Sequence, residues 1–316
     1  MERKYLIEYV SVTEAAAAAS AVLVGMGRKN DADALAVGAM RRAFDRIDAR
    51  GKVVIGEGEM DEAPMLFIGE VVGPEDPSLP MFDIAVDPLE GTNLCAKDQP
   101  GAITTLAVAG EGMLLAAPDM YMDKIATGPA GRGVVDLDRS PRENVVALAA
   151  AMSRPVHDIG VVVLERPRHD HIVEELRHAG ARVSLISDGD VAPAVAAALP
   201  NTGVHMMIGR GGAPEGVLAA AALRALGGEF QGRLYCEDEA QRERAISMGI
   251  ADPSAKLTRD EIVRGDCIFS ATGVTSGKLL RGARRRGDTV ELHSFIADSK
   301  TGSRRYVDTT IRLDKL

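Results

Sequence analysis

Cysteine and aromatic residues are scarce in this sequence. Its 316 residues include three cysteines, no tryptophan and only 3% aromatic residues. The cysteines are odd in number and show no CxxC spacing, so neither a disulfide framework nor a zinc site is expected. Cys95 is predicted to be a small packing residue, because cysteines outside disulfides are commonly buried. The core must therefore consist mainly of Ala, Val, Leu, Ile and Met.

Secretory signals and membrane spans are also not expected. The N-terminus, Met1–Lys4, is charged, and the apolar stretch after it ends at 25–28, short of the ~20 residues that a span requires. Together with the cysteine usage of a reducing compartment, this predicts a cytoplasmic protein without a membrane partner.

Basic residues are fewer than acidic ones, which gives a net charge of -9. A nucleic acid is therefore not an expected partner, because its phosphate backbone requires a basic face. A small phosphorylated substrate remains possible, since divalent cations can invert the local sign of charge.

The pattern of apolar residues predicts an α/β protein in two parts. Ser11–Glu14 is interpreted as a capping box that opens a helix ending at 25 or 27, and a second helix is expected from Asn30 or Asp31 to about Ile47. The expected strands of the first part are Lys52–Ile55, Phe82–Val86, Ile103–Ala109 and Met113–Ala116.

A polar stretch at 131–144 predicts the domain boundary. It separates an N-terminal metal-binding α+β domain, 1–140, from a C-terminal α/β substrate domain, 141–316, with a different packing left open for 280–316. Strands and helices alternate after it, which predicts a parallel sheet. The expected elements are strands at Gly160–Leu164, Arg182–Ile186, Val204–Ile208, Asp266–Ser270, Thr289–Ala297 and Arg304–Arg312, and helices at Arg168–His178, Val191–Ala198 and Pro214–Leu226.

The strongest motif is Asp83-Ile-Ala-Val-Asp87-Pro-Leu-Glu90-Gly-Thr92, in which an apolar strand ends in acidic residues. Pro88 is expected to end the strand because it has no N–H to donate. Asp87, Glu90 and Thr92 would then lie close together beyond the strand. Adjacent carboxylates repel each other unless a cation lies between them, and a nearby hydroxyl can hold a water ready to attack. The pattern is typical of a metal-assisted hydrolase, although a solvated turn is the simpler alternative.

Further acidic residues follow other strands or open helices. Glu57, in the turn Gly56–Glu59, offers an oxygen ligand of the kind that Mg²⁺ or Mn²⁺ prefers, while Glu59 is expected at the surface. Asp33 could be a ligand, or could simply favour a helix N-terminus. Glu215 opens a helix after a glycine-rich turn and could face a metal.

Three other patterns are rejected as motifs. Pro214 breaks a GxGxxG fingerprint that would begin at Gly209, which weakens the alternative of an NAD-dependent oxidoreductase. Ser276–Leu279 lacks the first glycine and the final hydroxyl residue of a P-loop. His169 and His171 are two residues apart, a spacing that does not suit a helical metal pair.

Taken together, these residues resemble the class II fructose-1,6-bisphosphatases of the GlpX type, within the lithium-sensitive phosphatase superfamily. The segments that carry the resemblance span nearly the whole chain in order. They are Lys29–Asp33, Ile55–Glu59, Asp83–Thr92, Ala117–Met122, Pro167–Asp170, Asp188–Asp190, Gly211–Gly216 and Phe269–Gly273.

The resemblance implies a layered αβαβα sugar-phosphatase fold, with two sheet-containing domains and the active site between them. It implies two or three Mg²⁺ or Mn²⁺ ions, held by Asp33, Glu57, Asp87, Glu90 and Glu215. The implied catalytic pair is Lys29 and Thr92. The implied substrate contacts are Glu90, Gly91, Thr92, Tyr121, Arg166, Pro167, Arg168, Asp188, Gly189, Asp190 and Gly212. Some relatives are expected to carry Lys at position 166, and Arg changes the donor geometry there.

The implied reaction is hydrolysis of the 1-phosphate of D-fructose 1,6-bisphosphate, a step of gluconeogenesis, by in-line attack of water. Thr92 and Lys29 would prepare that water, while Arg166 and Arg168 would hold the 6-phosphate. Alternatives are a dual fructose-1,6-/sedoheptulose-1,7-bisphosphatase, a phosphatase for inositol phosphates or phosphorylated nucleotides, and a non-catalytic sugar-phosphate sensor. A homodimer or homotetramer is also implied.

Overall fold

The computed structural model describes residues 4–58 and 65–315, and they divide into two compact units. Unit 1 comprises Met1–Leu115 and Arg264–Leu316, and unit 2 comprises Ala116–Val263. The predicted boundary at 140/141 differs from this division. The cause is non-local pairing, because the chain returns after residue 263 to add β11 (Cys267–Gly273) beside β4 (Ile103–Gly110) in an antiparallel ladder.

Unit 1 is built on an eight-stranded mixed sheet with the order β12-β13-β11-β4-β3-β1-β2, and β14 pairs with β13. Among its described strands, β1 and β3 pair in parallel and the other neighbours pair antiparallel. The elements not yet given bounds are α1 (Lys4–Ser20), η1 (Ala21–Leu23), α2 (Lys29–Phe44), β1 (Arg50–Ile55), β2 (Val71–Val72), β3 (Met81–Glu90), α3 (Thr92–Ala96), β12 (Arg284–Arg286), β13 (Thr289–Asp298), β14 (Ser303–Arg312) and η5 (Leu313–Lys315).

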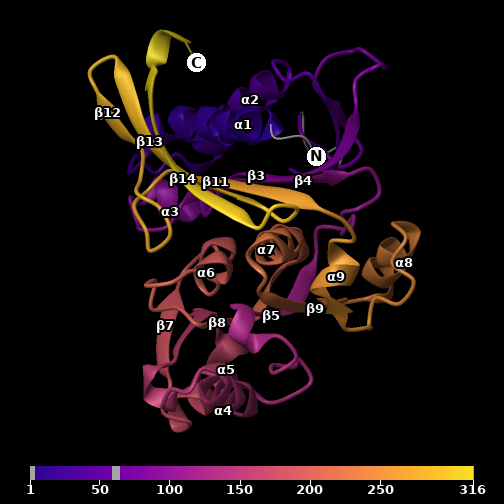
Figure 1. Cartoon of the computed structure of the whole chain (residues 1–316), viewed down its shortest axis with the longest axis vertical. Helices are drawn as coiled ribbons and strands as arrows, with labels where there is room; N and C mark the ends of the chain where they lie inside the picture. The colour runs from indigo at the N-terminus through magenta and orange to yellow at the C-terminus, as the bar shows by residue number, and fades with distance from the viewer. Residues whose placement is uncertain (1–3, 59–64, 316) are drawn as a thin grey trace. The chain divides into compact units, whose positions relative to one another are not determined.

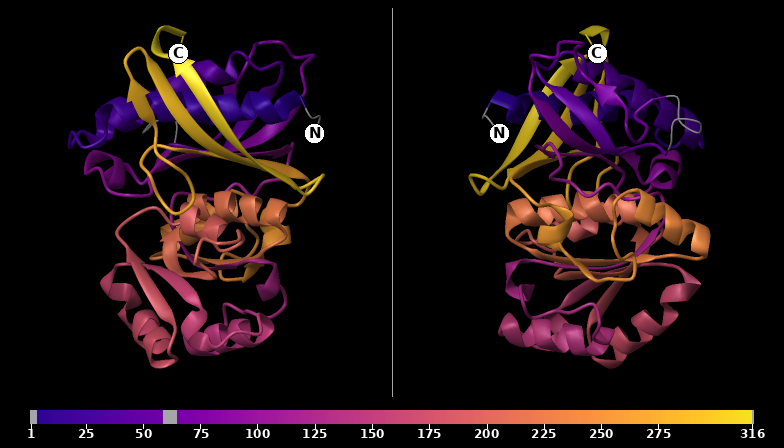
Figure 2. Two further views of the ribbon diagram at one scale, coloured as in Figure 1. Left: turned by 60° about the vertical axis from the view of Figure 1, so that its left-hand side comes forward. Right: turned by 90° about the vertical axis from the view of Figure 1, so that its right-hand side faces the viewer.

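Helices α1 and α2 lie side by side against the sheet of unit 1, and the long β13–β14 hairpin twists away from its edge (Figures 1 and 2). Their apolar faces, rich in Ala, join strand residues such as Ile84 and Leu106 in one core. This agrees with the expectation of a core poor in aromatic residues.

The predicted start of the first helix is wrong. Helix α1 begins at Lys4, so Ser11 lies in its interior and donates its hydroxyl to the carbonyl of Glu8 at 2.6 Å. Thr13 and Glu14, the other half of the supposed capping box, are buried. Their hydroxyl and carboxylate pair with sheet residues instead, so tertiary packing overrides the local capping signal.

The N-terminal helical segment, Lys4–Leu23, is long and apolar enough to cross a membrane by length and composition. The prediction that the apolar stretch here is too short for a membrane span was therefore also wrong. The most apolar 18 residues of this segment are 61% buried, and α1 packs against β3, β4, β11 and β13. Such burial is expected of the core helix of a folded unit.

Unit 2 is built on a six-stranded sheet with the order β10-β9-β5-β8-β6-β7. Helices cover both of its faces, α6 and α7 on one and α4 and α5 on the other (Figure 1). Its elements are β5 (Tyr121–Thr127), η2 (Pro129–Gly131), α4 (Pro141–Ala151), η3 (Val156–Asp158), β6 (Gly160–Leu164), η4 (Pro167–His169), α5 (Asp170–His178), β7 (Arg182–Ile186), α6 (Val191–Ala196), β8 (Met206–Gly212), α7 (Ala213–Leu226), β9 (Glu229–Tyr235), α8 (Glu239–Ser247), β10 (Leu257–Thr258) and α9 (Arg259–Ile262).

This sheet is mixed rather than parallel throughout. Strand β6 pairs in parallel with β7 and β8, while β5 pairs antiparallel with both β8 and β9. Both β5 and β9 were missed, and the predicted strand at Met113–Ala116 does not form. The glycines at 209–212, expected beyond a strand, belong to β8 because β5 pairs with them from Lys124 to Tyr121.

Candidate active site

The acidic motif lies on β3, which continues past Pro88 to Glu90. The ladder to β4 shifts register between Asp87, opposite Thr105, and Glu90, opposite Ile103. Two residues, Pro88 and Leu89, thus face a single residue of β4, and this bulge accommodates a proline that cannot donate to the ladder. The prediction that Pro88 ends the strand was therefore wrong by two residues.

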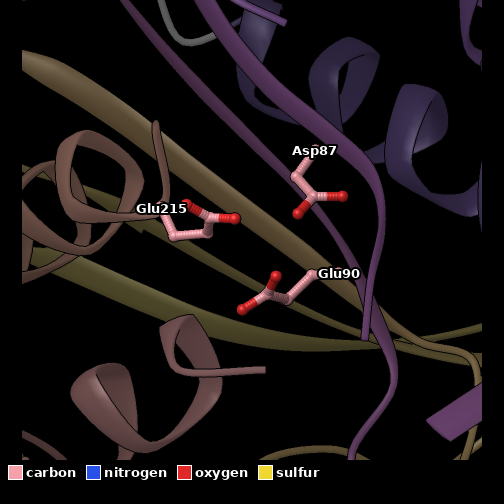
Figure 3. Close-up of side chains that lie close together, drawn as sticks. All are labelled: Asp87, Glu90 and Glu215. Carbon is pink, nitrogen blue, oxygen red and sulfur yellow. The ribbon is translucent and has the colours of Figure 1, made fainter. Parts of the chain in front are cut away.

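The two carboxylates beside the bulge lie close together, as predicted. Asp87 and Glu90 offer oxygens within 4.8 Å of each other, and Figure 3 shows both side chains extending from β3. Glu90 is buried and Asp87 half-buried, and the Leu89 N–H donates to Oδ1 of Asp87 at 3.0 Å. Asp83 has a different role, since its buried carboxylate accepts the Leu114 N–H at 3.0 Å.

Thr92 is the first residue of α3, immediately after a sharp turn at Gly91. Gly91 has φ 82° and ψ 51°, a left-handed conformation that favours glycine. A Cβ at this position would also lie 2.9 Å from Cδ1 of Leu94. The turn therefore requires glycine, and it places the Thr92 hydroxyl two residues from the Glu90 carboxylate.

Lys29 and Asp33 lie four residues apart on α2, and so share one face of that helix. The loop before α2 is fixed to α3, because the Gly25 and Gly27 N–H groups donate to the carbonyls of Cys95 and Ala96, each at 2.9 Å. The start of α2 is therefore held beside the helix that carries Thr92. Lys29 is exposed, and partial burial raises the pKa of Asp33 above its usual range.

Glu57 follows β1, which runs parallel to β3, so both strands end at the same edge of the unit 1 sheet. Its N–H donates to the carbonyl of Leu66 at 2.9 Å, and a Cβ at Gly56 would lie 1.9 Å from that carbonyl oxygen. The glycine thus permits the close approach of the two chain segments. Glu59 lies outside the described residues.

In unit 2, the carboxyl ends of β6, β7 and β8 meet at one edge of the sheet, as predicted for parallel strands. Arg166 and Arg168 follow β6, Asp188 and Asp190 follow β7, and Gly212 ends β8. Tyr121 also reaches this edge, because it starts β5 opposite Gly212.

The arginines are held by backbone carbonyls. Arg166 donates to the carbonyls of Glu165 and Ser187 at 2.8 and 2.9 Å. Pro167, exposed, opens the short helix η4 that leads to Arg168. The guanidinium of Arg168 lies 4.8 Å from the centroid of the Tyr121 ring, a cation–π distance that fixes its plane.

Asp190 is held by a buried lysine that was not predicted. Lys124 is 0% exposed, and its Nζ lies 2.6 Å from Oδ2 of Asp190 and donates to the Gly212 carbonyl at 2.9 Å. A Cβ at Gly211 would lie 2.1 Å from the same Asp190 oxygen, so the glycine makes room for the pair. The sequence signal was a lysine between the apolar residues Met122 and Ala126 of one strand face.

The remaining Asp190 oxygen, Oδ1, is buried without a hydrogen-bond partner among the described residues. Neighbouring Asp188 is half-buried, and Gly189 between them has φ 76°, which favours glycine at that turn. The buried acceptor of Asp190 is therefore suited to a hydroxyl donor from a ligand.

Glu215, the third side chain in Figure 3, belongs to α7 of unit 2. Its Oε2 is buried without a hydrogen-bond partner among the described residues, and burial raises the pKa of the carboxyl, opposed by the charge of Lys124. A Cβ at Gly212 would lie 2.0 Å from that oxygen. Gly212 thus allows the carboxylate to fold back over the start of its helix.

The sequence model of the family described as "Bacterial fructose-1,6-bisphosphatase, glpX-encoded" matches residues 3–311. The chain belongs to this family. It is therefore a phosphoric monoester hydrolase that acts on fructose 1,6-bisphosphate, and its family is the one predicted from the motifs.

Curated relatives agree with this assignment. The "D-fructose 1,6-bisphosphatase class 2/sedoheptulose 1,7-bisphosphatase" of Synechococcus elongatus is 44% identical, over 99% of this chain and 98% of that protein. The protein of the same name from Synechocystis is 45% identical, over 96% of this chain and 94% of the relative. A solved inositol monophosphatase from Anabaena (Nostoc) sp. PCC 7120 is 15% identical over 62% of this chain and 71% of that chain, with a TM-score of 0.32, and this weak likeness carries no argument.

Proposed function

We propose that this fructose-1,6-bisphosphatase removes the 1-phosphate of its substrate at the junction of β3 and α3. One observation carries the proposal, namely the carboxylates of Asp87 and Glu90 within 4.8 Å of each other, followed two residues later by the Thr92 hydroxyl. The products would be fructose 6-phosphate and inorganic phosphate.

We propose that Asp33, Glu57, Asp87, Glu90 and Glu215 hold two or three divalent ions, Mg²⁺ or Mn²⁺. The donors are all carboxylate oxygens, which hard cations prefer. The orphaned Oε2 of Glu215 is a buried acceptor of the kind that a cation would satisfy. When bound, such ions would neutralise the phosphate oxygens and stabilise the attacking and leaving oxygens.

Thr92 and Lys29 would prepare the attacking water. The Thr92 hydroxyl, fixed at the start of α3, would accept or donate a hydrogen bond that orients the water in line with the scissile bond. Lys29 is exposed at the start of α2, which hydrogen bonds tie to α3, and its ammonium would assist Thr92.

The sugar phosphate would bind to side chains at one edge of the unit 2 sheet. Asp188 and Asp190 would accept hydrogen bonds from sugar hydroxyls, and the unpaired Oδ1 of Asp190 supports this role. Arg166 and Arg168 would hold the 6-phosphate, for which planar guanidinium groups are well suited. Tyr121, Pro167, Gly189, Gly212 and the Glu90–Thr92 segment complete the proposed substrate contacts.

A second candidate is dual activity on sedoheptulose 1,7-bisphosphate, which the names of the curated relatives favour. A silent sensor is less well supported, because a pure binder does not need a hydroxyl beside paired carboxylates.

Phosphate release from fructose 1,6-bisphosphate, sedoheptulose 1,7-bisphosphate, inositol monophosphate and a 3′-phosphorylated nucleotide, each with Mn²⁺, tests these proposals. The fructose bisphosphate should be hydrolysed, with comparable kcat/KM for the sedoheptulose bisphosphate if the enzyme is dual. Phosphate release only from the inositol or nucleotide substrates would contradict the proposal, and no release from any substrate would favour the sensor.

Location and assembly are also proposed, as a cytoplasmic homodimer or homotetramer. The resemblance to the class II enzymes supports both statements. Light scattering after gel filtration should give a mass of two or four times 33.4 kDa, and a monomer at micromolar concentration would contradict the assembly.

A further inference from the structure

Unit 2 contains a cavity on the face of its sheet covered by α4 and α5. Its volume is about 290 Å³, and its lining comes from β5, β8, β9, the loop before α4 with the first residue of that helix, and the segment from η4 into α5. The lining includes the apolar side chains of Leu137, Pro141, Ile172 and Ile208. A cavity of this size accommodates a small metabolite but not a dinucleotide.

Four arginines line this cavity, in a chain whose net charge is -9. They are Arg139, Arg168, Arg210 and Arg233. The acidic residue in the lining, Asp123, already pairs with Arg210 through bonds of 2.7 and 3.1 Å. Among the described residues, neither Arg139 nor Arg168 forms an ion pair with a carboxylate. The cavity therefore carries excess positive charge.

The guanidinium groups are held in place before any ligand binds. Arg210 lies 3.3 Å from the Tyr235 ring centroid in addition to its bidentate bond with Asp123. Arg168 donates to the Arg210 carbonyl at 2.9 Å, and Arg233 pairs with Asp138. Fixed guanidinium planes lose little entropy when they bind an oxyanion.

Two of these arginines also have an unsatisfied donor. The Nε atoms of Arg168 and Arg233 are buried without a hydrogen-bond partner among the described residues. A buried N–H of a cation without an acceptor is costly, and an anion in the cavity would supply acceptors.

Nearby His169 does not provide further donors. Its Nε2 accepts the Arg210 N–H at 2.8 Å, which requires the proton on Nδ1, 2.8 Å from the Leu164 carbonyl. Burial and the neighbouring arginines lower the pKa of His169, in keeping with this neutral state. The imidazole thus fixes the loop that carries Arg168 and leaves anion binding to the arginines.

We propose that this cavity is a second anion site, which binds the phosphate group of a small phosphate ester separately from the substrate. The arginines take the phosphate, and Leu137, Ile172 and Ile208 face the carbon body of the ligand. The proposal is linked to the proposed function through Arg168, which is also assigned to the 6-phosphate of the substrate. Occupancy of the cavity thereby gives a route by which a phosphorylated metabolite alters substrate affinity.

Binding of ³²P-labelled inorganic phosphate, measured by equilibrium dialysis of the full-length protein, tests the proposal. Saturating fructose 6-phosphate is included, in EDTA without added divalent ions, so that the product fills the proposed sugar and 6-phosphate positions and the proposed 1-phosphate site has no cations to hold phosphate. We expect one phosphate per chain to remain bound under these conditions. We expect Arg233→Gln to weaken this binding by about tenfold or more, because it removes a charged hydrogen-bond donor.

Two further variants make the result specific. Arg139→Gln should also weaken phosphate binding. Arg139 is exposed, so its replacement should not disturb folding, and this variant tests the proposal even if Arg233→Gln misfolds. Asp138 keeps Lys256 as a partner at 2.8 Å when Arg233 is replaced. Arg182→Gln is the matched control, since Arg182 is an exposed arginine of the same unit outside the cavity and should bind phosphate as the wild type does.

Three outcomes would overturn the proposal. The first is that no phosphate is bound in the presence of fructose 6-phosphate. The second is that Arg233→Gln and Arg139→Gln bind phosphate as the wild type does. The third is that fructose 6-phosphate displaces all bound phosphate and that Arg233→Gln raises the KM for fructose 1,6-bisphosphate. The last would assign the cavity to the substrate. The kcat for fructose 1,6-bisphosphate, measured in parallel, reports on the proposed function separately, because Arg139 and Arg233 have no role in it.

Discussion

Thr92 has the most specific chemical role among the proposed catalytic residues. It is half-buried at the first position of α3, and the left-handed turn at Gly91 fixes its backbone. Threonine and valine have nearly the same shape, so exchange between them removes the hydroxyl while retaining the packing.

We therefore expect Thr92→Val to lower kcat by about 100-fold or more, the usual scale of positioned proton-transfer or polar catalysis. KM should change little, because binding of the sugar phosphate depends on other residues. Thr92→Ser, which keeps the hydroxyl, should retain appreciable activity. Near-normal kcat in the valine variant with saturating metal would show that Thr92 has no catalytic role.

Lys124 and Asp190 form a buried ion pair, with side chains 0% and 5% exposed. Lys124→Met should lower the free energy of unfolding by about 3–5 kcal/mol, because Asp190 is left buried without its countercharge. The double variant Lys124→Met/Asp190→Asn should recover part of this loss. Urea unfolding of the single and double variants measures both effects.

The exposed Lys97→Met variant is the control for Lys124→Met, and it should leave stability within about 0.5 kcal/mol of the wild type. If the double variant were no more stable than Lys124→Met, the loss would not arise from the uncompensated Asp190 charge. Activity should fall in both variants through a raised KM, since Asp190 is the proposed acceptor for a sugar hydroxyl.

Cys95 illustrates a residue whose simpler interpretation was correct. It is 0% exposed, and burial, with the nearby Asp98, raises the pKa of its thiol to about 11. The thiol is thus protonated at neutral pH and does not act as a nucleophile, as expected of a packing residue.

At the scale of elements, α1 joins the sheet of unit 1 through a buried polar network. Glu14 accepts hydrogen bonds from Thr309 at 2.6 Å and Ser294 at 3.2 Å, and Thr13 contacts Ser270 and Thr272 at 3.0 and 2.8 Å. Glu14 has no ion-pair partner among the described residues, and burial raises the pKa of its carboxyl, partly opposed by these hydrogen bonds.

This shift predicts a pH dependence of stability. Because the folded pKa of Glu14 exceeds the unfolded value of about 4.3, the stabilising state is the protonated one, and stability should fall as pH rises through the folded pKa. Glu14→Gln should abolish this fall and raise the free energy of unfolding at pH 7 by about 1 kcal/mol, since the amide carbonyl still accepts both hydrogen bonds.

Chemical denaturation of wild type and Glu14→Gln from pH 4 to pH 8 measures this effect. Glu111→Gln, at an exposed turn of the same unit, is the control and should follow the wild-type curve. A parallel pH dependence in wild type and Glu14→Gln would show that the buried carboxylate does not titrate in this range.

The strands show which local patterns were informative. Strands β6, β7, β11, β13 and β14 were predicted within a few residues, because each is an apolar or alternating run bounded by turn residues. Strands β5 and β9 were missed because polar residues interrupt them, among them Asp123 and Lys124 on β5 and Arg233 on β9. Those residues find partners only in the folded unit, Asp123 with Arg210 and Lys124 with Asp190.

At the scale of the whole molecule, the proposed metal ligands come from segments far apart in sequence, from Asp33 to Glu215. Removal of bound ions with EDTA should abolish phosphate release, since carboxylates alone cannot neutralise the substrate phosphate. Excess Mg²⁺ or Mn²⁺ should restore it. Full activity in chelator, with the metal content of the protein verified by elemental analysis, would contradict metal dependence.

The sequence by itself determined the family and its chemistry. The acids, the hydroxyl and the glycines of the site occupy contiguous motifs, because catalysis requires particular side chains at turns that follow strands. A local segment such as Asp83–Thr92 therefore carries enough information to indicate the family and to propose its site.

Only the tertiary structure decided how these motifs are supported. The return of β11 to β4 set the division into two units, and the packing of α1 on the sheet placed Ser11 in a helix interior. The ion pair of Lys124 with Asp190 and the arginine-lined cavity depend likewise on residues from separate strands and loops. These features have the same physical reason. The energy of a strand pairing or of a buried charge depends on partners that are distant in sequence.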